Sequence, residues 1–492
     1  MNLLIAIVPI LLVLLGITVF KIPAWITSIV SAVITFVLAV TVFDGGTSAM
    51  LATTQSGVIS ALEVSFLVWG AFALLELMQV STAMNRIKTS VAGITNDKRV
   101  QTVLIAFCIG VFIEGATGNG AAGAILGPFL VGLGFAPLTA AAAVLIGNGV
   151  PPCFGGAGTP TIAGMSGITD QIALSGLVTM TGRFLAIGMI CVPFVLLLVL
   201  YGKKSLKGMG GYLITVGICM AISMLLTTQF IGGELADLIT GVVGVAVSLV
   251  YIKKIGVKHG EEYQGETGVV YESSVSTIKA FAPYILLMIM LPAVRFSFSL
   301  TALCKYGYPT WIGAVIHVCV FLGACIMGCA KDFLKCEVNA LKKLVQPIIA
   351  LCSLYALANL MNSSGMISLI AQTLADVAGK TYPAVSVVIG VLGAFITGSC
   401  LGSNRLFAGL HLQATTALGI NNFVSITASS AGASLGNMIC PNNIIAVNAT
   451  LELKKSEGAV MARTFKACLI MAVIYAIFAL LYTYVLFPNF AA

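Results

Sequence analysis

The chain has 492 residues, of which 59% are hydrophobic and only 9% are charged. Soluble globular proteins carry about 25% charged residues, so this composition nearly excludes a water-soluble fold. The net charge of +8 would suit a nucleic-acid partner, but the basic residues lie in short polar segments between apolar runs, and we therefore expect no nucleic-acid binding.

Apolar runs recur along the whole chain, and examples are residues 3–20, 22–43, 187–201, 212–230 and 467–487. A helix needs about 20 predominantly apolar residues to cross a bilayer, and these runs are close to that length or longer. The first run has no basic segment before it and no small-residue cleavage site after it, so we expect a retained first helix. The pattern predicts an all-α integral membrane protein embedded in the lipid bilayer.

Nineteen of the 25 lysine and arginine residues fall in five short segments between apolar runs. The five segments hold Arg86, Lys88, Lys98 and Arg99; Lys203, Lys204 and Lys207; Lys253, Lys254, Lys258 and Lys279; Lys331, Lys335, Lys342 and Lys343; and Lys454, Lys455, Arg463 and Lys466. Short loops rich in lysine and arginine mark the cytoplasmic side of a membrane. With one crossing for residues 59–85, this rule places the 44–57 loop and both chain termini outside. We predict a multi-pass protein of the plasma (inner) membrane.

Two stretches interrupt the apolar pattern with glycine, asparagine and proline. The first reads F-I-E-G-A-T-G-N-G at 112–120 and continues G-N-G-V-P-P-C-F-G-G-A-G-T-P-T-I-A at 147–163. The second reads F-I-T-G-S-C-L-G-S-N at 395–404 and continues A-G-A-S-L-G-N-M-I-C-P-N-N-I-I-A at 431–446. Phe112 aligns with Phe395 and Ile162 with Ile445, both at an offset of 283 residues. The layout predicts two inverted repeats: an N-terminal membrane repeat at 1–252, a cytoplasmic linker loop at 253–279 and a C-terminal membrane repeat at 280–492.

Glycine, proline and asparagine clusters at membrane depth have a physical meaning. Unpaired backbone is tolerated there only where the chain is buried in protein or lines a cavity. Broken segments at matching positions of two halves are typical of a transporter's binding site. We therefore predict re-entrant or broken helices at 114–123, 147–164, 397–405 and 432–443. Close helix packing would explain isolated glycines, but not prolines and asparagines arriving together in both halves.

Ionisable residues inside a membrane are costly, so each one is a functional candidate. The candidates are Glu63, Glu76, Glu114, Arg183, Asp237, Arg295, His317, Arg405 and His411. We favour Glu114 as the proton carrier because it lies in a glycine-rich break; the alternative is a structural carboxylate in a salt bridge. Arg405 could offer a donor fork to a substrate carboxylate, with His411 further along the same helix. The alternatives are an arginine at the membrane surface and a histidine satisfied in the core.

Asparagine and serine side chains at the breaks supply neutral donors and acceptors. The predicted substrate-binding residues of this kind are Asn119, Asn148, Ser399, Ser403, Asn404, Asn437 and Asn442. Such groups can pair a hydroxyl and a carboxylate without bringing a second charge into the membrane. The sequence has no nucleophile elbow, phosphate loop or zinc-binding helix motif, so we expect a protein that is not an enzyme and has no cofactor or metal.

At these breaks the chain resembles the L-lactate permease family of bacterial carriers. The resemblance covers nearly the whole chain and rests on the segments at 112–120, L-V-G-L-G-F-A-P-L at 130–138, F-G-G-A-G-T-P at 154–160, T-G-S at 397–399, S-N-R-L-F-A at 403–408 and N-M-I-C-P at 437–441. It implies a secondary active transporter that imports 2-hydroxymonocarboxylates such as lactate and glycolate by proton symport. It also implies about 12 to 14 transmembrane helices, similar to the ion-transporter folds with re-entrant hairpins.

The chain departs from the family pattern at five positions. The family has an aromatic residue at Asn119, a proline near Ala122, an acidic residue at Cys400, a small residue at Arg405 and a glutamine at His411. Losing a carboxylate and gaining an arginine makes the region more positive. An alternative is therefore a carrier of a different or more anionic carboxylate, coupled to sodium instead of a proton. An intramembrane enzyme is the less favoured third reading, and the oligomeric state is not predicted.

Overall fold

The computed structural model describes residues 2–18, 20, 22–83, 85–86, 95–118, 120–162, 164–165, 168–169, 171–233, 235–257, 261–264, 272–297 and 308–490. The helices of the first half are α1 Asn2–Thr18, α2 Ala24–Thr41, α3 Thr47–Val80, α5 Lys98–Thr102, α6 Gly110–Thr117, α7 Ala121–Gly132, α8 Pro137–Gly147, α9 Gly155–Ile162, α10 Leu174–Tyr201, α11 Gly210–Phe230 and α12 Ala236–Lys254. Those of the second half are α13 Thr277–Ser297, α15 Tyr308–Met327, α16 Phe333–Ser363, α17 Met366–Ala378, α18 Tyr382–Thr397, α19 Cys400–Leu418, α20 Asn422–Asn437, α21 Pro441–Thr450 and α22 Glu457–Leu481.

Several described helices have the length and composition of membrane spans. Five meet this condition as single helices: Leu174–Tyr201, Gly210–Phe230, Ala236–Lys254, Asp376–Thr397 and Glu457–Leu486. A pair within the α16 region, Ala330–Gln346 and Ile348–Met361, makes a sixth span if its 45° bend is bridged. Shorter apolar helices, among them α7 and α8, accompany these spans. The all-α membrane class is confirmed, and the total of about 12 to 14 crossings stays a prediction.

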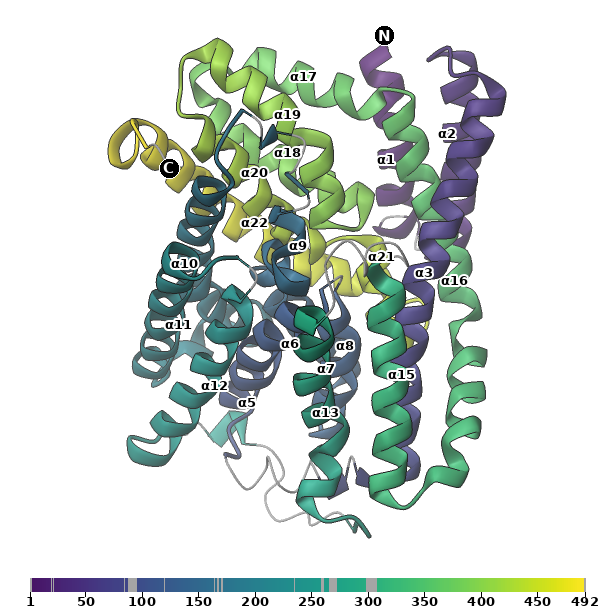
Figure 1. Ribbon diagram of the computed structural model, residues 1–492, viewed down its shortest axis with the longest axis vertical. Helices are drawn as coiled ribbons and strands as arrows, with labels where there is room; N and C mark the ends of the chain where they lie inside the picture. Colours follow the sequence, from purple (N-terminus) through teal and green to yellow (C-terminus); the bar gives the residue numbers. More distant parts are fainter. Residues whose placement is uncertain are drawn as a thin grey trace.

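The long helices α3 and α16 pack along one another and form one side of the molecule. In Figure 1 α2, α3, α15 and α16 stand side by side, while α10, α11 and α12 lie across the molecule from them. Gly57 of α3 permits close packing, because a Cβ there would lie 2.8 Å from the backbone nitrogen of Ala356 in α16. Trp69 Nε1 also donates to the Glu337 carbonyl at 2.9 Å, which ties the same two helices together.

All four predicted breaks interrupt helices that lie between the α2, α3, α15 and α16 group and the α10, α11 and α12 group. The helical structure is interrupted between α6 and α7, between α8 and α9 at 148–154, between α18 and α19 at 398–399 and between α20 and α21 at 438–440. A short 3-10 turn, Pro151–Cys153, lies inside the second of them. The broken pairs follow one another in the same order in both halves, as a repeat requires. The inverted relation of the halves and their boundary at 253–279 stay predictions, and much of that segment lies outside the described residues.

The basic segments gather at one end of the molecule. Arg463 donates to Thr139 at the start of α8 at 3.2 Å, and Arg99 donates to the Ser205 and Lys207 carbonyls at 3.1 and 3.0 Å. Figure 1 shows both termini toward the opposite end, where α17 also lies. This arrangement agrees with the positive-inside pattern, but which end faces the cytoplasm stays a prediction.

Candidate functional site

The two breaks within each half touch one another. A Cβ on Gly118, in the first break, would lie 3.0 Å from the Gly156 nitrogen at the start of α9. In the second half, a Cβ on Gly398 would collide with the side-chain amide of Asn442 at the start of α21. Both Gly118 and Gly398 have positive φ angles, of 68° and 73°, which glycine adopts at no steric cost. Glycine at these positions therefore both turns the chain and admits the neighbouring break.

Contacts between the halves bring all four breaks to one place. Asn404 of α19 donates from Nδ2 to the Pro160 carbonyl of α9 at 2.9 Å. A second contact between the halves joins the first break to the fourth, since a Cβ on Gly120 would lie 3.3 Å from Asn443 Oδ1 in α21. We call this meeting point the junction: residues 118, 120, 148–154, 398–399 and 438–440, with the helix turns next to them. The helices α7, α9, α19 and α21 all begin there, and the N-terminus of a helix favours an anion.

Glu114 lies on the first-half side of the junction and is almost completely enclosed. Its side chain is 1% exposed. Its Oε1 accepts the Gly120 N–H at 3.1 Å, so the carboxylate spans the break that follows α6. The Asn148 amide also interacts with this carboxylate, while Oε2 has no hydrogen-bond partner. Glu114 therefore has no cationic partner among its recorded contacts, in contrast to the salt-bridged alternative.

Asp237 lies beside Glu114 and was not selected as a site residue from the sequence. It begins α12, is 1% exposed, and neither of its carboxylate oxygens has a hydrogen-bond partner. A Cβ on Gly115 would lie 2.6 Å from Asp237 Cβ, so α12 approaches α6 at the residue after Glu114. The sequence marked it only as one of nine ionisable candidates, and an acidic residue at the start of an apolar run is explained equally well by a helix N-terminus.

On the second-half side, Asn404 belongs to a buried polar cluster. Besides Pro160, its Nδ2 contacts Ser430 Oγ at 3.0 Å. Cys153 Sγ lies 2.9 Å from Ser434 Oγ and 4.0 Å from Cys400 Sγ. The cluster thus joins the 3-10 turn of the first half to α19 and α20 of the second. Asn404 therefore connects the breaks of the two halves, and its amide N–H groups are already bonded within the protein.

Three other predicted amides have free hydrogen-bonding capacity. Neither Asn442 Nδ2 nor Asn442 Oδ1 has a partner, although the side chain is only 5% exposed. The oxygens of Asn148 and Asn437 are likewise buried without a partner. Buried polar groups are normally satisfied, so unpaired amides at one point mark a place for a polar ligand or water.

The structure does not bring every predicted residue to a free position in the junction. Ser399 lies at the α18–α19 break and is partly buried, but the Ser403 hydroxyl donates to the Gly390 carbonyl at 3.2 Å. His411 is fully buried and its Nδ1 lies 2.6 Å from the Tyr382 hydroxyl at the start of α18. The ring is therefore in the core, but only half of the alternative of a satisfied histidine is met, because its Nε2 is buried with no hydrogen-bond partner. Asn119 and the Arg405 side chain lie outside the described residues, and for Arg405 only its place in α19 is described.

Of the remaining charged candidates, Arg183, Glu76 and His317 have partners elsewhere, and His317 Nδ1 lies 2.9 Å from Glu337 Oε1. The Arg295 side chain lies outside the described residues. The Arg183 guanidinium lies 4.4 Å from the Phe487 ring centre, near the C-terminus. Lys343 bonds Glu76 at 2.7 Å and Glu452 at 2.6 Å, and its charge and hydrogen bond lower the pKa of the Glu452 carboxyl below its usual value. These contacts are structural ion pairs and ring contacts at helix ends.

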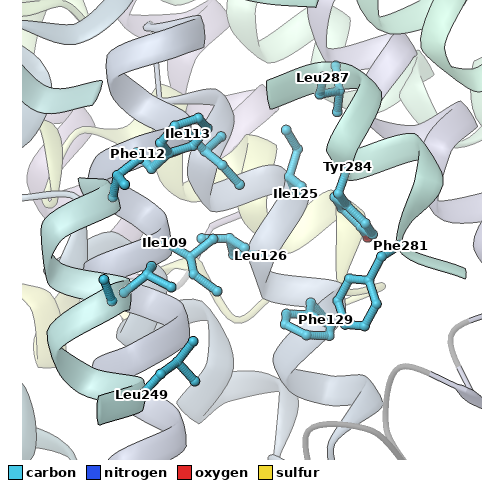
Figure 2. A pocket seen from close by; sticks show the side chains of 13 residues that line it. Ile109, Phe112, Ile113, Ile125, Leu126, Phe129, Leu249, Phe281, Tyr284 and Leu287 are labelled. Atoms are coloured by element: carbon cyan, nitrogen blue, oxygen red, sulfur yellow. The ribbon is translucent and has the colours of Figure 1, made fainter. Parts of the chain in front are cut away.

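Two cavities lie near the junction, and only one is polar. The first, of about 410 Å³, lies between α6, α7, α12 and α13, and Figure 2 shows that apolar side chains such as Phe112, Ile125 and Leu287 surround it. It cannot satisfy a carboxylate. The second, of about 660 Å³, lies at the basic end and is lined by Lys343, Glu452, Lys454 and Asn448 among others. Three residues of α21, Ile445, Asn448 and Ala449, line this cavity, and Asn448 is buried with both amide atoms unpaired.

Comparison with known proteins gives the family. The model of the L-lactate permease family matches residues 2–307 and 292–486, which is nearly the whole chain. The chain belongs to the L-lactate permease family. This permease is 29% identical to the L-lactate permease of Halalkalibacterium halodurans, over 94% of this chain and 93% of that protein. It is 26% identical to both the glycolate permease GlcA and the L-lactate permease of Escherichia coli K12; these matches cover 99% and 98% of this chain, respectively, and 96% of each relative.

The permease is therefore a multi-pass transporter of the cell membrane and not an enzyme. One solved structure, that of the MtrF efflux pump of Neisseria gonorrhoeae, covers 90% of this chain and 85% of its own at 13% identity, with a TM-score of 0.33. That likeness is too distant to establish a shared fold. What distinguishes the permease's interior is the junction: enclosed carboxylates on the first-half side, unpaired amides from both halves, and four helix N-termini around them.

Proposed function

We propose that this permease imports a 2-hydroxymonocarboxylate such as lactate or glycolate by proton symport, and that the junction binds the substrate. The observation that carries this proposal is the convergence of the four breaks around unpaired amides. Helix N-termini and amide N–H groups can bind a carboxylate, and amide oxygens can accept from the 2-hydroxyl. Relatives named for lactate and for glycolate span nearly the full length of the chain, which supports the same substrate class.

Within this proposal Asn442 and Asn148 contact the substrate, and Glu114 carries the proton. Asn442 stands at the start of α21 with its whole amide free. Asn148 lies between the substrate amides and Glu114, since its amide interacts with that carboxylate and its oxygen is unpaired. A proton on Glu114 would cancel the negative charge that otherwise repels an incoming anion, which links the two bindings.

Counterflow in proteoliposomes tests the substrate class. Vesicles loaded with unlabelled L-lactate should take up external labelled lactate transiently above equilibrium, as only a carrier does. A panel of competitors should then rank lactate and glycolate above acetate, which lacks the hydroxyl, and above malate and citrate. If a di- or tricarboxylate drives counterflow and lactate does not, the alternative of a more anionic substrate replaces this proposal.

Imposed ion gradients test the coupling. An inward proton gradient should drive lactate accumulation in sodium-free buffer, and the proton ionophore that collapses the gradient should abolish it. Accumulation that instead requires an inward sodium gradient would establish the sodium-coupled alternative.

A further inference from the structure

Asp237 and Glu114 form a pair of enclosed carboxylates on adjacent helices. Each is 1% exposed, and Glu114 Oε2 and both Asp237 oxygens have no hydrogen-bond partner. The pair is built by close helix packing: Gly115 admits Asp237 Cβ, and one turn further along α12 a Cβ on Gly241 would lie 2.5 Å from the Phe112 nitrogen. This close packing of α6 against α12 brings the two carboxylates to neighbouring positions.

No described cation faces this pair. The ionisable groups on the surrounding elements are the thiols of Cys153, of Cys108 in the π-helical segment before α6 and of Cys219 in α11, together with the Tyr212 hydroxyl. None of them is a cation. The sequences of α9 and α11, which also pack against this region, contain no charged residue. Lys253 and Lys254 lie at the far end of α12, and Glu234 lies outside the described residues. Two negative charges here would face each other without compensation from any side chain that the structure describes; the side chains of Arg295 and Arg405 lie outside that part.

Burying an isolated carboxylate is costly, and burying two side by side costs more. A single proton bonded to one carboxylate oxygen removes one of the two charges. We propose that Glu114 and Asp237 together hold one proton, and that this carboxyl pair is the coupling site of the permease. The proposal rests on the proton symport proposed above and assigns Asp237 to it.

The proton is taken up and released without any other chemistry. An O–H bond forms on one carboxylate when a proton enters from the outer side, and it breaks when the proton passes to water on the cytoplasmic side. Asn148 and the Gly120 N–H connect Glu114 to the junction, so occupancy of the pair and occupancy of the substrate amides affect each other. Substrate and proton then leave in the same cycle.

The test compares Asp237→Asn, Glu114→Gln and Glu76→Gln in proteoliposomes. Glu76 is the matched control, because it is a buried carboxylate that already pairs with Lys343. An inward gradient of about one pH unit supports about ten-fold lactate accumulation by the wild type, since each pH unit is a factor of ten. Asp237→Asn and Glu114→Gln should each reduce the accumulation ratio to about one while keeping counterflow within about 3-fold of wild type. Glu76→Gln should keep the full ratio.

The outcomes separate this inference from the proposed function. If Glu114→Gln loses accumulation and Asp237→Asn keeps it, Glu114 carries the proton alone and the pair is refuted while proton symport stands. If the wild type accumulates lactate only on a sodium gradient, proton symport and the pair both fail. Should Asp237→Asn not fold, the infrared C=O band of a neutral carboxyl in the purified wild type decides. A band at neutral pH that Glu114→Gln removes and that Asp237→Glu shifts supports the pair. A band that Asp237→Glu leaves unchanged, or the absence of any such band, overturns it.

Discussion

Asn404 and Asn442 are both junction amides, but they differ in what they can offer a ligand. The Asn404 donor is used by Pro160 and Ser430, whereas Asn442 has no partner. We therefore expect Asn442→Ala to weaken lactate affinity by about 2- to 12-fold, which corresponds to one neutral hydrogen bond of about 0.5–1.5 kcal/mol. Competition of labelled lactate counterflow measures this, with the thermal stability unchanged.

Asn404→Ala is the matched comparison. It should lower the thermal unfolding temperature, because the Pro160 carbonyl and Ser430 lose their partner inside the protein, at a cost of about 1–3 kcal/mol. Equal affinity losses in both variants, with no difference in stability, would contradict the division of roles between them.

His411 supports the position of α18 and not the substrate. Its ring is fully buried and bonded to the Tyr382 hydroxyl, about eleven residues and roughly 16 Å along α19 from the break. His411→Gln should therefore leave the apparent affinity for lactate unchanged, and Tyr382→Phe should lower stability to a similar extent. A change in substrate preference on His411→Gln, measured with the competitor panel, would return this residue to the binding site.

Most of the polar residues at the junction could be singled out from the sequence, but the sequence did not show which of them have free hydrogen-bonding atoms. Glu114, Asn148, Asn404, Asn437 and Asn442 could be predicted because a polar group at a glycine-rich break has few structural uses. Asp237 could not, since its significance depends on Gly115 admitting it from another helix. The same limit applies to Ser403 and His411, because only tertiary contacts show that the Ser403 hydroxyl and the His411 Nδ1 already have partners.

At the scale of elements, glycine at the helix ends sets how closely the breaks approach. Gly398 and Gly419 both end helices with positive φ, of 73° and 66°. Gly398 faces Asn442, whereas a Cβ on Gly419 would meet nothing within 4 Å. Gly398→Ala should displace the Asn442 amide and reduce lactate transport severely. Gly419→Ala should lower the stability only by the backbone strain of about 1 kcal/mol, and this variant should transport lactate at the wild-type rate.

Transport assays and thermal unfolding of the two alanine variants measure this difference. Similar losses of transport in both would mean that strain alone, and not the Gly398–Asn442 contact, explains the effect. All four breaks were predictable at this scale, because glycine, proline and asparagine act locally on the backbone. The π-helical segment Val103–Ile109 before α6 could not be predicted, because nothing in its apolar sequence distinguishes it from an α-helix.

At the scale of the whole molecule, the basic end and the termini lie at opposite ends. Cysteines introduced at Lys331 and at Gly46, both exposed, report the orientation in a background without other accessible cysteines. The positive-inside rule predicts that a membrane-impermeant thiol reagent labels position 46 in intact cells and position 331 only in inverted vesicles. The reverse pattern would place both termini in the cytoplasm.

The global architecture was predictable in class but not in detail. Composition and apolar runs predicted the membrane fold, and the repeated break motifs predicted where the chain is interrupted. The diagonal contacts, Asn404 with Pro160 and Gly120 with Asn443, join segments more than 200 residues apart in the sequence. No local pattern encodes such pairings, so the convergence of the four breaks could be expected only by analogy with other transporters.

Cryo-electron microscopy of the permease with saturating L-lactate would show directly whether the substrate binds at the junction. We expect the anion there, with its carboxylate near the N-terminus of α21 and Asn442, and with Asn148 between it and Glu114. Lactate bound instead only in the polar cavity beside Lys343 and Lys454, with the junction amides paired to one another, would contradict it.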